Sequence, residues 1–157
     1  MILDAQTQFS DSQALTATAL STNVYDLKVS GALGTGEAMA VVINIEVAAD
    51  QTTGDEDYTF AVEFGSDAAM TTDLQEVAVR TYESGTPTAP AQNADLLVSG
   101  YKVVLPIPPS GLDDVNRYLA VRYTLAGTSP SVTVSAYLTP QSAIDNYAAY
   151  ANGYTIS

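Results

Sequence analysis

The sequence lacks three residue types on which many active sites depend. Its 157 residues include no Cys, no His and no Trp. Without Cys the chain has no disulfide, no thiolate-bound zinc or iron–sulfur centre and no thiol nucleophile. Without His it has neither the base of a Ser-His-Asp triad nor an imidazole metal ligand. We therefore expect a protein that is not an enzyme, and we assign no catalytic, cofactor-binding or metal-binding residue.

Basic residues are scarce as well. Five Lys and Arg stand against 18 Asp and Glu, which gives a net charge of −13. Because binding to nucleic acid or to an anionic membrane depends on clustered Lys and Arg, neither is an expected partner. The N-terminus carries Asp4 and Asp11 where a secretory signal needs a basic and then an apolar segment. The longest apolar stretch, AMAVVINIEV, is far shorter than the ~20 residues that span a bilayer, so we expect a soluble protein.

The pattern that is present is an alternation of apolar and polar residues with period two, which is typical of β-strands with one buried face. It covers residues 25–29, 39–47, 58–64, 77–79, 101–105, 119–125 and 132–138. In these segments Tyr58, Val77, Val79 and Tyr123 are expected to face the core. Turns rich in Gly and Pro separate the segments. The length and pattern predict one domain, residues 1–157, folded as an antiparallel jelly roll or β-sandwich of about seven strands, or eight if residues 15–20 also pair.

The two ends of the chain differ from the middle. Residues 1 to about 14 are apolar in part but have no regular period, so they form an arm that either closes the edge of its own sandwich or reaches a neighbour. From about 139 to 157 we expect one short helix and a tail. Thr139 is a good N-cap and Pro140 suits the first helical position. Ile144 and Tyr147 recur at helical spacing before Gly153 ends the run.

Charged residues offer three weaker signals. The acidic turn at residues 50–57 contains a fragment of a calcium-ligand pattern, but a solvated turn is the interpretation we favour. Asp113 and Asp114 could be read as the carboxylate pair of a glycosidase, yet neighbours in sequence usually point apart, so a turn or cap role is favoured. The basic residues near predicted strands either pair with carboxylates across strands, which we favour, or anchor an interface; they are Arg80, Lys102, Arg117 and Arg122.

Tyr is the most abundant aromatic residue, with ten copies against three Phe. Some lie on the outward side of predicted strands or crowd the C-terminal segment, where they could contact a protein, stack on sugar rings, or simply occupy the surface. Together with the apolar ends of the chain, they form a candidate interface. Its members are Ile2, Leu3, Phe9, Tyr118, Tyr137, Ile144, Tyr147, Tyr150, Tyr154 and Ile156.

Three segments resemble the capsid cement, or decoration, proteins of tailed bacteriophages, the family described from a short-tailed Bordetella phage. They are ILDAQTQFSDSQALTATALSTNVYDL, AADQTTGDEDYTFAVEF and YLTPQSAIDNYAAYANGYTIS. The resemblance implies a jelly roll that coats the outside of the phage head and clamps subunits of the major capsid protein. It implies a protein made in the host cytoplasm and located in the virion, and it carries over no catalytic residue. A homo-oligomer, dimer or trimer, is compatible with it.

Two further expectations follow from the residues. The main alternative is a carbohydrate-binding sandwich in which outward Tyr residues form a sugar platform. The charge is also uneven, since residues 1–79 hold Lys28 against 13 acids and residues 80–157 hold four basic residues against five acids. If this division becomes two sides in space, the acidic side faces solvent and the near-neutral, Tyr-bearing side faces the capsid.

Overall fold

The computed structural model describes residues 7–28, 37–108 and 116–144. Within them the chain forms ten strands, one 3₁₀ helix and a helical turn at residues 141–144. The elements are β1 (Gln8–Leu15), β2 (Ala19–Leu20), β3 (Tyr25–Asp26), β4 (Met39–Val47), β5 (Asp57–Gly65), β6 (Gln75–Glu83), β7 (Gln92–Asn93), η1 (Ala94–Leu96), β8 (Lys102–Ile107), β9 (Tyr118–Ala126) and β10 (Val132–Pro140).

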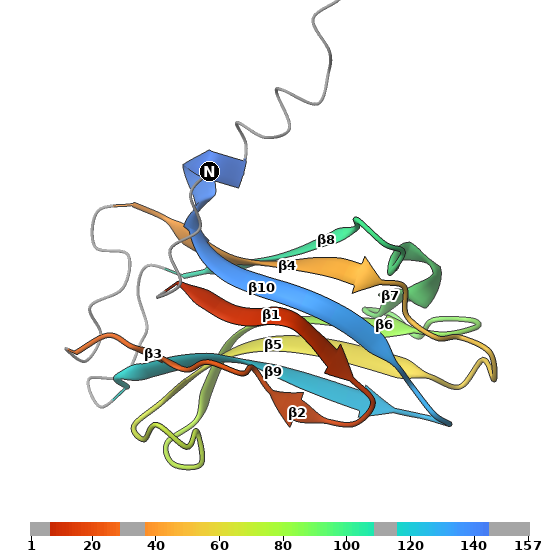
Figure 1. Ribbon diagram of the computed structural model, residues 1–157, viewed down its shortest axis with the longest axis horizontal. Helices are drawn as coiled ribbons and strands as arrows, with labels where there is room; N and C mark the ends of the chain where they lie inside the picture. The colour runs from red at the N-terminus through yellow and green to blue at the C-terminus, as the bar shows by residue number, and fades with distance from the viewer. Residues whose placement is uncertain (1–6, 29–36, 109–115, 145–157) are drawn as a thin grey trace, which may run out of the picture.

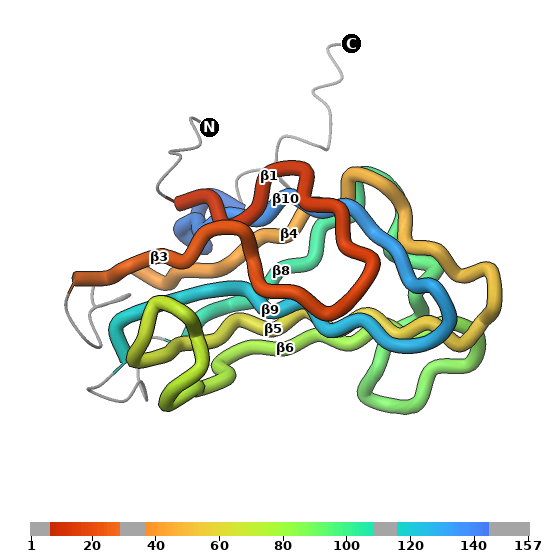
Figure 2. Tube along the Cα trace, turned by 60° about the horizontal axis from the view of Figure 1, so that its bottom comes forward, coloured from red at the N-terminus to blue at the C-terminus, as the bar shows by residue number. Residues whose placement is uncertain are grey.

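The strands form two sheets that pack face to face (Figures 1 and 2). Sheet A has the order β1-β10-β4-β8, and sheet B has the order β2-β9-β5-β6-β7, with β3 also paired to β9. Neighbouring strands are antiparallel, except that β6 and β7 run parallel. Along the chain, β1 lies in sheet A, β2 and β3 in B, β4 in A, β5 and β6 in B, β8 in A, β9 in B and β10 in A. This repeated crossing between two antiparallel sheets is the jelly-roll arrangement, as predicted.

The described residues form ten strands, whereas the sequence predicts about seven or eight, and short strands account for the difference. Three of the ten strands, β2, β3 and β7, contain only two residues each. Segment 15–20, which would have added an eighth strand if it paired, is divided between the sheets: Leu15 ends β1 in sheet A, and Ala19 and Leu20 form β2 in sheet B. The seven longer strands are those that bury the core.

The core lies between the sheets and follows the predicted alternation. Strand β4 has the predicted bounds, Met39–Val47. On β5, Tyr58, Phe60, Val62 and Phe64 are fully buried. The Phe60 ring meets the rings of Tyr82 and Tyr123 edge to face, at centroid distances of 5.9 and 6.0 Å. These aromatic contacts join β5 to both of its neighbours in sheet B and make this the most densely aromatic part of the core.

The first described residues belong to the sandwich. Within the arm predicted over residues 1 to about 14, the part from Gln8 onward is strand β1, which pairs with β10 at the edge of sheet A. Phe9 is 1% exposed and joins the core. Buried Ser10 shares a 2.8 Å hydrogen bond with the Tyr123 hydroxyl, which crosses from sheet A to sheet B. Of the two roles left open for the arm, this part closes its own sandwich.

Strand β6 departs in part from the predicted alternation. We expected Val77 and Val79 to face the core; Val77 packs against it, but Val79 lies opposite Ala61 and is 45% exposed. The inward positions are those opposite core residues of β5, so that Arg80 lies opposite Phe60. The pairing shifts between Val62 and Glu63, where β6 has an extra residue. Because side chains alternate at every residue, this bulge exchanges the two faces of the strand.

The last strand continues further than predicted. Thr139 and Pro140, expected as the N-cap and first residue of a helix, are the final residues of β10 and lie opposite Ala40 and Met39 of β4. The helical turn follows at residues 141–144. As part of β10, Thr139 and Pro140 pair with β4, whereas as the start of a short helix they would belong to an element that is only marginally stable by itself. The strand therefore extends to Pro140. The remainder of the predicted helix and tail, residues 145–157, lies outside the described residues.

Candidate functional site

The two ends of the described chain meet at one end of sheet A. The Leu138 backbone N–H donates to the Thr7 carbonyl at 2.8 Å, and the Gln141 N–H donates to the Ala38 carbonyl at 2.7 Å. Thr7, the first described residue, and the turn at residues 141–144 therefore both lie near the start of β4. Any contact made by the termini starts from this end of the molecule.

The candidate interface residues are distributed unevenly. Ile144 is partly buried beside the end of β10. Phe9 is a correction to the candidate set, because its side chain is enclosed in its own core and is not on the surface. The other terminal members lie outside the described residues; they are Ile2, Leu3, Tyr147, Tyr150, Tyr154 and Ile156.

Tyr118 and Tyr137 are both partly exposed, but they lie on opposite sides of the sandwich. Tyr118 is on the outward face of β9 in sheet B, and Tyr137 is on the outward face of β10 in sheet A. The Arg117 guanidinium lies over the Tyr118 ring, 5.3 Å from its centroid. The two rings cannot form one sugar platform, which removes the simplest form of the carbohydrate-binding alternative.

Tyr137 is part of an apolar row across sheet A. It lies opposite Val42 of β4, which in turn lies opposite Val104 of β8. Directly paired residues on neighbouring antiparallel strands share a face of the sheet. Val42 is 3% exposed, whereas Tyr137 and Val104 are partly exposed. Sequence alternation assigned Tyr137 to the outside but missed this row, because Val42 and Val104 occupy positions expected to be polar.

The acidic turn between β4 and β5 is organised around Glu56. Its carboxylate accepts hydrogen bonds from the backbone N–H groups of Thr53 and Gly54, both at 2.9 Å, and from the N–H of Asp55 at 3.1 Å. The Thr53 hydroxyl also donates to Glu56. This hydroxyl and the backbone donors lower the pKa of Glu56 from its ordinary 4.5 to about 2. The Glu56 side chain is therefore engaged by its own loop.

The same turn is tied to the neighbouring β9–β10 turn. Asp55 accepts hydrogen bonds from the Thr128 N–H at 3.1 Å and from the Thr128 hydroxyl at 2.8 Å. Gly127, at φ +92°, lies so close that a Cβ there would be 2.2 Å from the Asp55 carbonyl oxygen, so only glycine fits. The Asp55 pKa is lowered by the Thr53 and Thr128 donors. In the described part of the chain, no group of three or more Asp and Glu residues is arranged to hold a metal ion.

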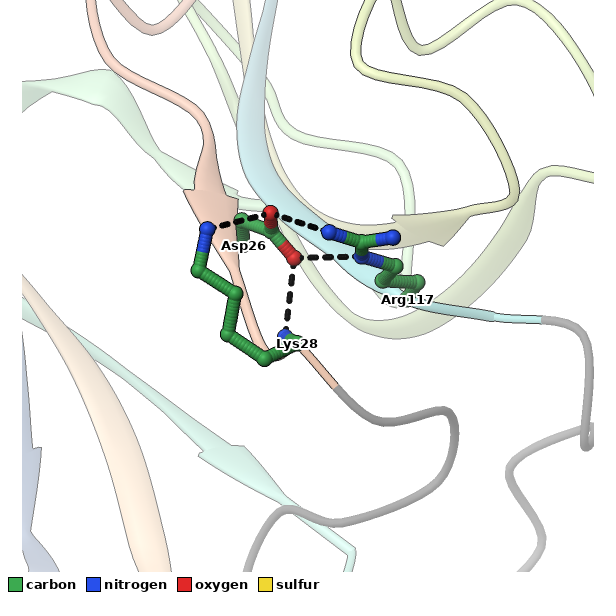
Figure 3. A network of polar contacts seen from close by, with 3 residues as sticks. All are labelled: Asp26, Lys28 and Arg117. Atoms are coloured by element: carbon green, nitrogen blue, oxygen red, sulfur yellow. Dashed lines mark hydrogen bonds and ion pairs between the residues drawn. The ribbon is translucent and has the colours of Figure 1, made fainter.

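Asp26 holds two cations at the other end of the sandwich (Figure 3). The Arg117 Nε and Nη2 atoms donate to its two carboxylate oxygens at 2.6 and 2.7 Å, and Lys28 Nζ lies 2.9 Å from Oδ2. Arg117, and then Lys28, hold the Asp26 pKa well below its ordinary value. This network joins β3 to the start of β9, as expected for cross-strand pairing. Asp113 and Asp114 lie outside the described residues.

Arg122 makes the second pairing, on the outward face of sheet B. Its Nε atom is 2.8 Å from Glu63 Oε2, and its Nη2 atom donates to the Met70 carbonyl at 3.2 Å. Glu63 and Met70 are 8% and 2% exposed. The guanidinium thus joins the middle of the sheet to the loop between β5 and β6. Arg80 and Lys102, the other two basic residues, line a cleft on the side of the sandwich instead.

The comparison with known protein families gives one decisive result. The family model Bbp16 matches residues 9–138, more than four fifths of the chain and almost the whole sandwich. The chain belongs to the Bbp16 family. This is a family of Bordetella phage proteins, and membership makes the chain a bacteriophage structural protein. No curated protein sequence matches the chain significantly. None of the described helical segments is long and apolar enough to cross a membrane.

Proposed function

We propose that the chain is a capsid cement protein that binds the outer surface of a phage head and stabilises contacts between major capsid protein subunits. The observation that carries the proposal is the Bbp16 match over almost the whole jelly roll. The likeness of both sequence ends to cement proteins supports the same role. Such a protein needs a rigid scaffold and a partner surface, because modest contacts repeated over a symmetric shell add up to strong binding.

The structure supports an orientation for this role. The described ends of the chain, Thr7 and residues 141–144, adjoin sheet A, and the apolar row Tyr137–Val42–Val104 lies on its outward face, which makes this sheet the capsid side in the proposal. The acidic turn follows the last residue of β4, whereas the described ends of the chain, Thr7 and Gln141, lie near its first residue. Nine residues of strand separate them by roughly 25 Å. The acidic turn therefore points away from the end that carries the termini.

The charge division does not coincide with the two sheets. Sheet A combines β1 and β4 from the acidic first half with β8 and β10 from the second half, and sheet B is mixed in the same way. In the proposed orientation, the solvent-facing acidic part is the 50–57 turn rather than a whole sheet.

The binding test uses phage heads that lack the protein. Purified chain is added to expanded heads, and occupancy is measured by gel densitometry and cryo-EM. We expect stoichiometric, saturable binding and a higher temperature of head disruption. A variant that lacks residues 148–157 should bind less well if the tail contributes, provided that its near-UV circular dichroism shows an intact fold. Wild-type protein that leaves the heads bare at saturating concentration would refute the cement role.

The orientation has a matched pair of variants. Tyr137→Ala and Tyr118→Ala remove the same side chain from opposite faces of the sandwich. We expect Tyr137→Ala to weaken head binding at least fivefold and Tyr118→Ala to leave it unchanged, because only sheet A faces the capsid. The reverse pattern would show that sheet B is the capsid side while leaving the cement role in place.

A further inference from the structure

Sheet A ends at β8 and sheet B ends at β6 and β7, and these strands lie on the same side of the sandwich (Figure 1). Residues of the three strands line a small cleft. Its volume is about 210 Å³. Arg80 contributes from β6, Gln92 from β7, and Lys102 from β8. The cleft thus gathers two of the five basic residues of a chain whose net charge is −13.

Arg80 stands apart from the other arginines. Ion pairs in the described part of the chain engage Arg117, Arg122 and Lys28, but none engages Arg80. Its side chain points to the inner side of sheet B, opposite Phe60, yet it is exposed because β6 lies near the open edge of the sandwich. A guanidinium keeps its charge at any physiological pH and offers five donors in a planar fork. This charge is available to a group from outside the chain.

The groups beside Arg80 are hydrogen-bond donors. The Tyr82 and Tyr101 rings meet edge to face, with centroids 6.3 Å apart and planes at 86°. Burial, and then its hydrogen bond with Tyr101, raise the pKa of the Tyr82 phenol above its ordinary value, so this hydroxyl keeps its proton and is already paired with Tyr101. The Gln92 amide and the Lys102 ammonium add further donors, and the cleft lining includes no carboxylate. Such a set of groups is complementary to an anion.

The remaining walls narrow the class of anion. Val103 and Val104 of β8 also contribute to the lining, but the Val103 side chain is 2% exposed and belongs to the core, so the two Tyr rings and Val104 are the apolar side chains left to contact a ligand. An Asp or Glu side chain has a methylene stem that packs on apolar walls and a planar carboxylate that matches the guanidinium fork. Inorganic phosphate has no such stem. The volume is several times the ~30 Å³ that one water molecule occupies in the liquid, which leaves room for a side chain but not for a large ligand.

We propose that the Arg80 cleft is a binding site for a carboxylate, the Asp or Glu side chain of a partner protein. Arg80 makes the bidentate contact, Lys102 adds positive charge, and the tyrosines form the walls. That a partner's side chain occupies the site on the phage head rests on the proposed function, whereas the affinity of the cleft for a carboxylate does not.

The first experiment measures the carboxylate site alone. Sodium glutarate is titrated into the ¹⁵N-labelled full chain at constant ionic strength, with sodium chloride as the reference anion, and two-dimensional NMR spectra are recorded. We expect saturable shifts of the Arg80 Nε–H, the Gln92 side-chain amide and the backbone amides of residues 101–104, with a Kd on the order of 10 mM. Sodium phosphate is titrated in parallel and should bind more weakly.

The matched variants are Arg80→Gln and Lys28→Gln, which remove one positive charge each. Arg80→Gln should lose the saturable shifts, while Lys28→Gln, at the opposite end of the sandwich, should keep them. Absence of saturable shifts in the wild-type chain would overturn the proposal and leave Arg80 and Lys102 as charges that oppose edge-to-edge pairing of β6 and β8. Tighter binding of phosphate than of glutarate would overturn the assignment to a carboxylate.

The second experiment asks for the source of the carboxylate. Binding of wild-type, Arg80→Gln and Lys28→Gln chains to undecorated heads is compared, and their self-association is measured by sedimentation. We expect Arg80→Gln to weaken one of these two associations at least tenfold, which identifies the capsid protein or a second copy as the source. If all three chains bind the heads and self-associate equally well, the Arg80 cleft does not contact a partner, but the cement role stands. If the wild-type chain does not bind the heads, the cement role itself is refuted.

Discussion

Two arginines of sheet B, Arg122 and Arg80, show opposite uses of scarce positive charge. Arg122 lies on the outward face of β9, where it contacts Glu63 and the Met70 carbonyl. Arg80 lies on the inward side of β6 and has no carboxylate partner among the residues that the structure describes. The first is held by the fold, and the second lines an open cleft. Pairing, rather than exposure to solvent alone, distinguishes a structural cation from one available to a partner.

The same distinction applies to the acids. Glu56, Asp55 and Asp26 accept hydrogen bonds from donors of their own chain, so their oxygens are already engaged. These three carboxylates are therefore satisfied within the chain and are not available to a partner. We therefore expect the effects of substitution to follow the number of internal partners.

The largest effect is expected for Arg122→Met. The substitution leaves the Glu63 carboxylate, 8% exposed, without its ion-pair partner. Removing one member of a partly buried pair costs about 1–3 kcal/mol of unfolding free energy. Chemical denaturation measures the loss. The double variant Glu63→Gln/Arg122→Met should recover part of it, because no buried charge then remains; a double variant less stable than Arg122→Met would contradict the pairing.

The next prediction concerns acid stability and the Glu56 turn. The Glu56 pKa is lowered from 4.5 to about 2 in the folded chain, so its ionised form contributes stability that is present above pH 4.5 and is lost as pH falls towards 2. Glu56→Gln should be less stable than wild type at pH 7, and the difference should shrink between pH 4.5 and 2. Thermal unfolding across this range measures it. A constant difference would show that the carboxylate charge is not responsible.

Much of the fold could be predicted from the sequence, because alternation is a local property. The bounds of β4 and the inward positions of β5 follow directly from residues 39–47 and 58–64. Strand β6 could not be predicted in the same way, since the bulge opposite Val62 and Glu63 reverses which residues face inward. Arg80 was consequently assigned to the polar face, and the cleft was missed.

The candidate site was harder to predict than the strands, because alternation along the sequence does not show which strands pair or to which sheet each one belongs. Alternation correctly placed Tyr118 and Tyr137 on outward faces, but it could not show that the faces belong to different sheets. Phe9 illustrates the opposite case, because its segment has too little periodicity to reveal a strand that pairs with β10, far away in the sequence. The apolar row Tyr137–Val42–Val104 likewise exists only through register between three strands.

A smaller loss is expected for Asp26→Asn. The change removes the charge that Arg117 and Lys28 share but keeps the shape of the side chain. Arg117 and Asp26 side chains are 42% and 23% exposed, so solvent and salt screen their attraction. The unfolding midpoint should fall by less than in Arg122→Met, and the difference from wild type should decrease as sodium chloride is raised. If Asp26→Asn lost more stability than Arg122→Met, the Asp26 network rather than the Arg122–Glu63 pair would be the more stabilising of the two.

The smallest effect is expected for Arg80→Gln. Its guanidinium has no internal ion pair to lose, and its side chain is exposed, so the unfolding free energy should change by less than about 0.5 kcal/mol. The measurement is the same denaturation used for Arg122→Met, which makes the two arginines directly comparable. If Arg80→Gln and Arg122→Met lost nearly equal stability, Arg80 would be a structural residue like Arg122, and the contrast between a paired and an available arginine would be wrong. A stable Arg80→Gln chain that no longer binds a carboxylate would locate the function of this cation outside its own fold.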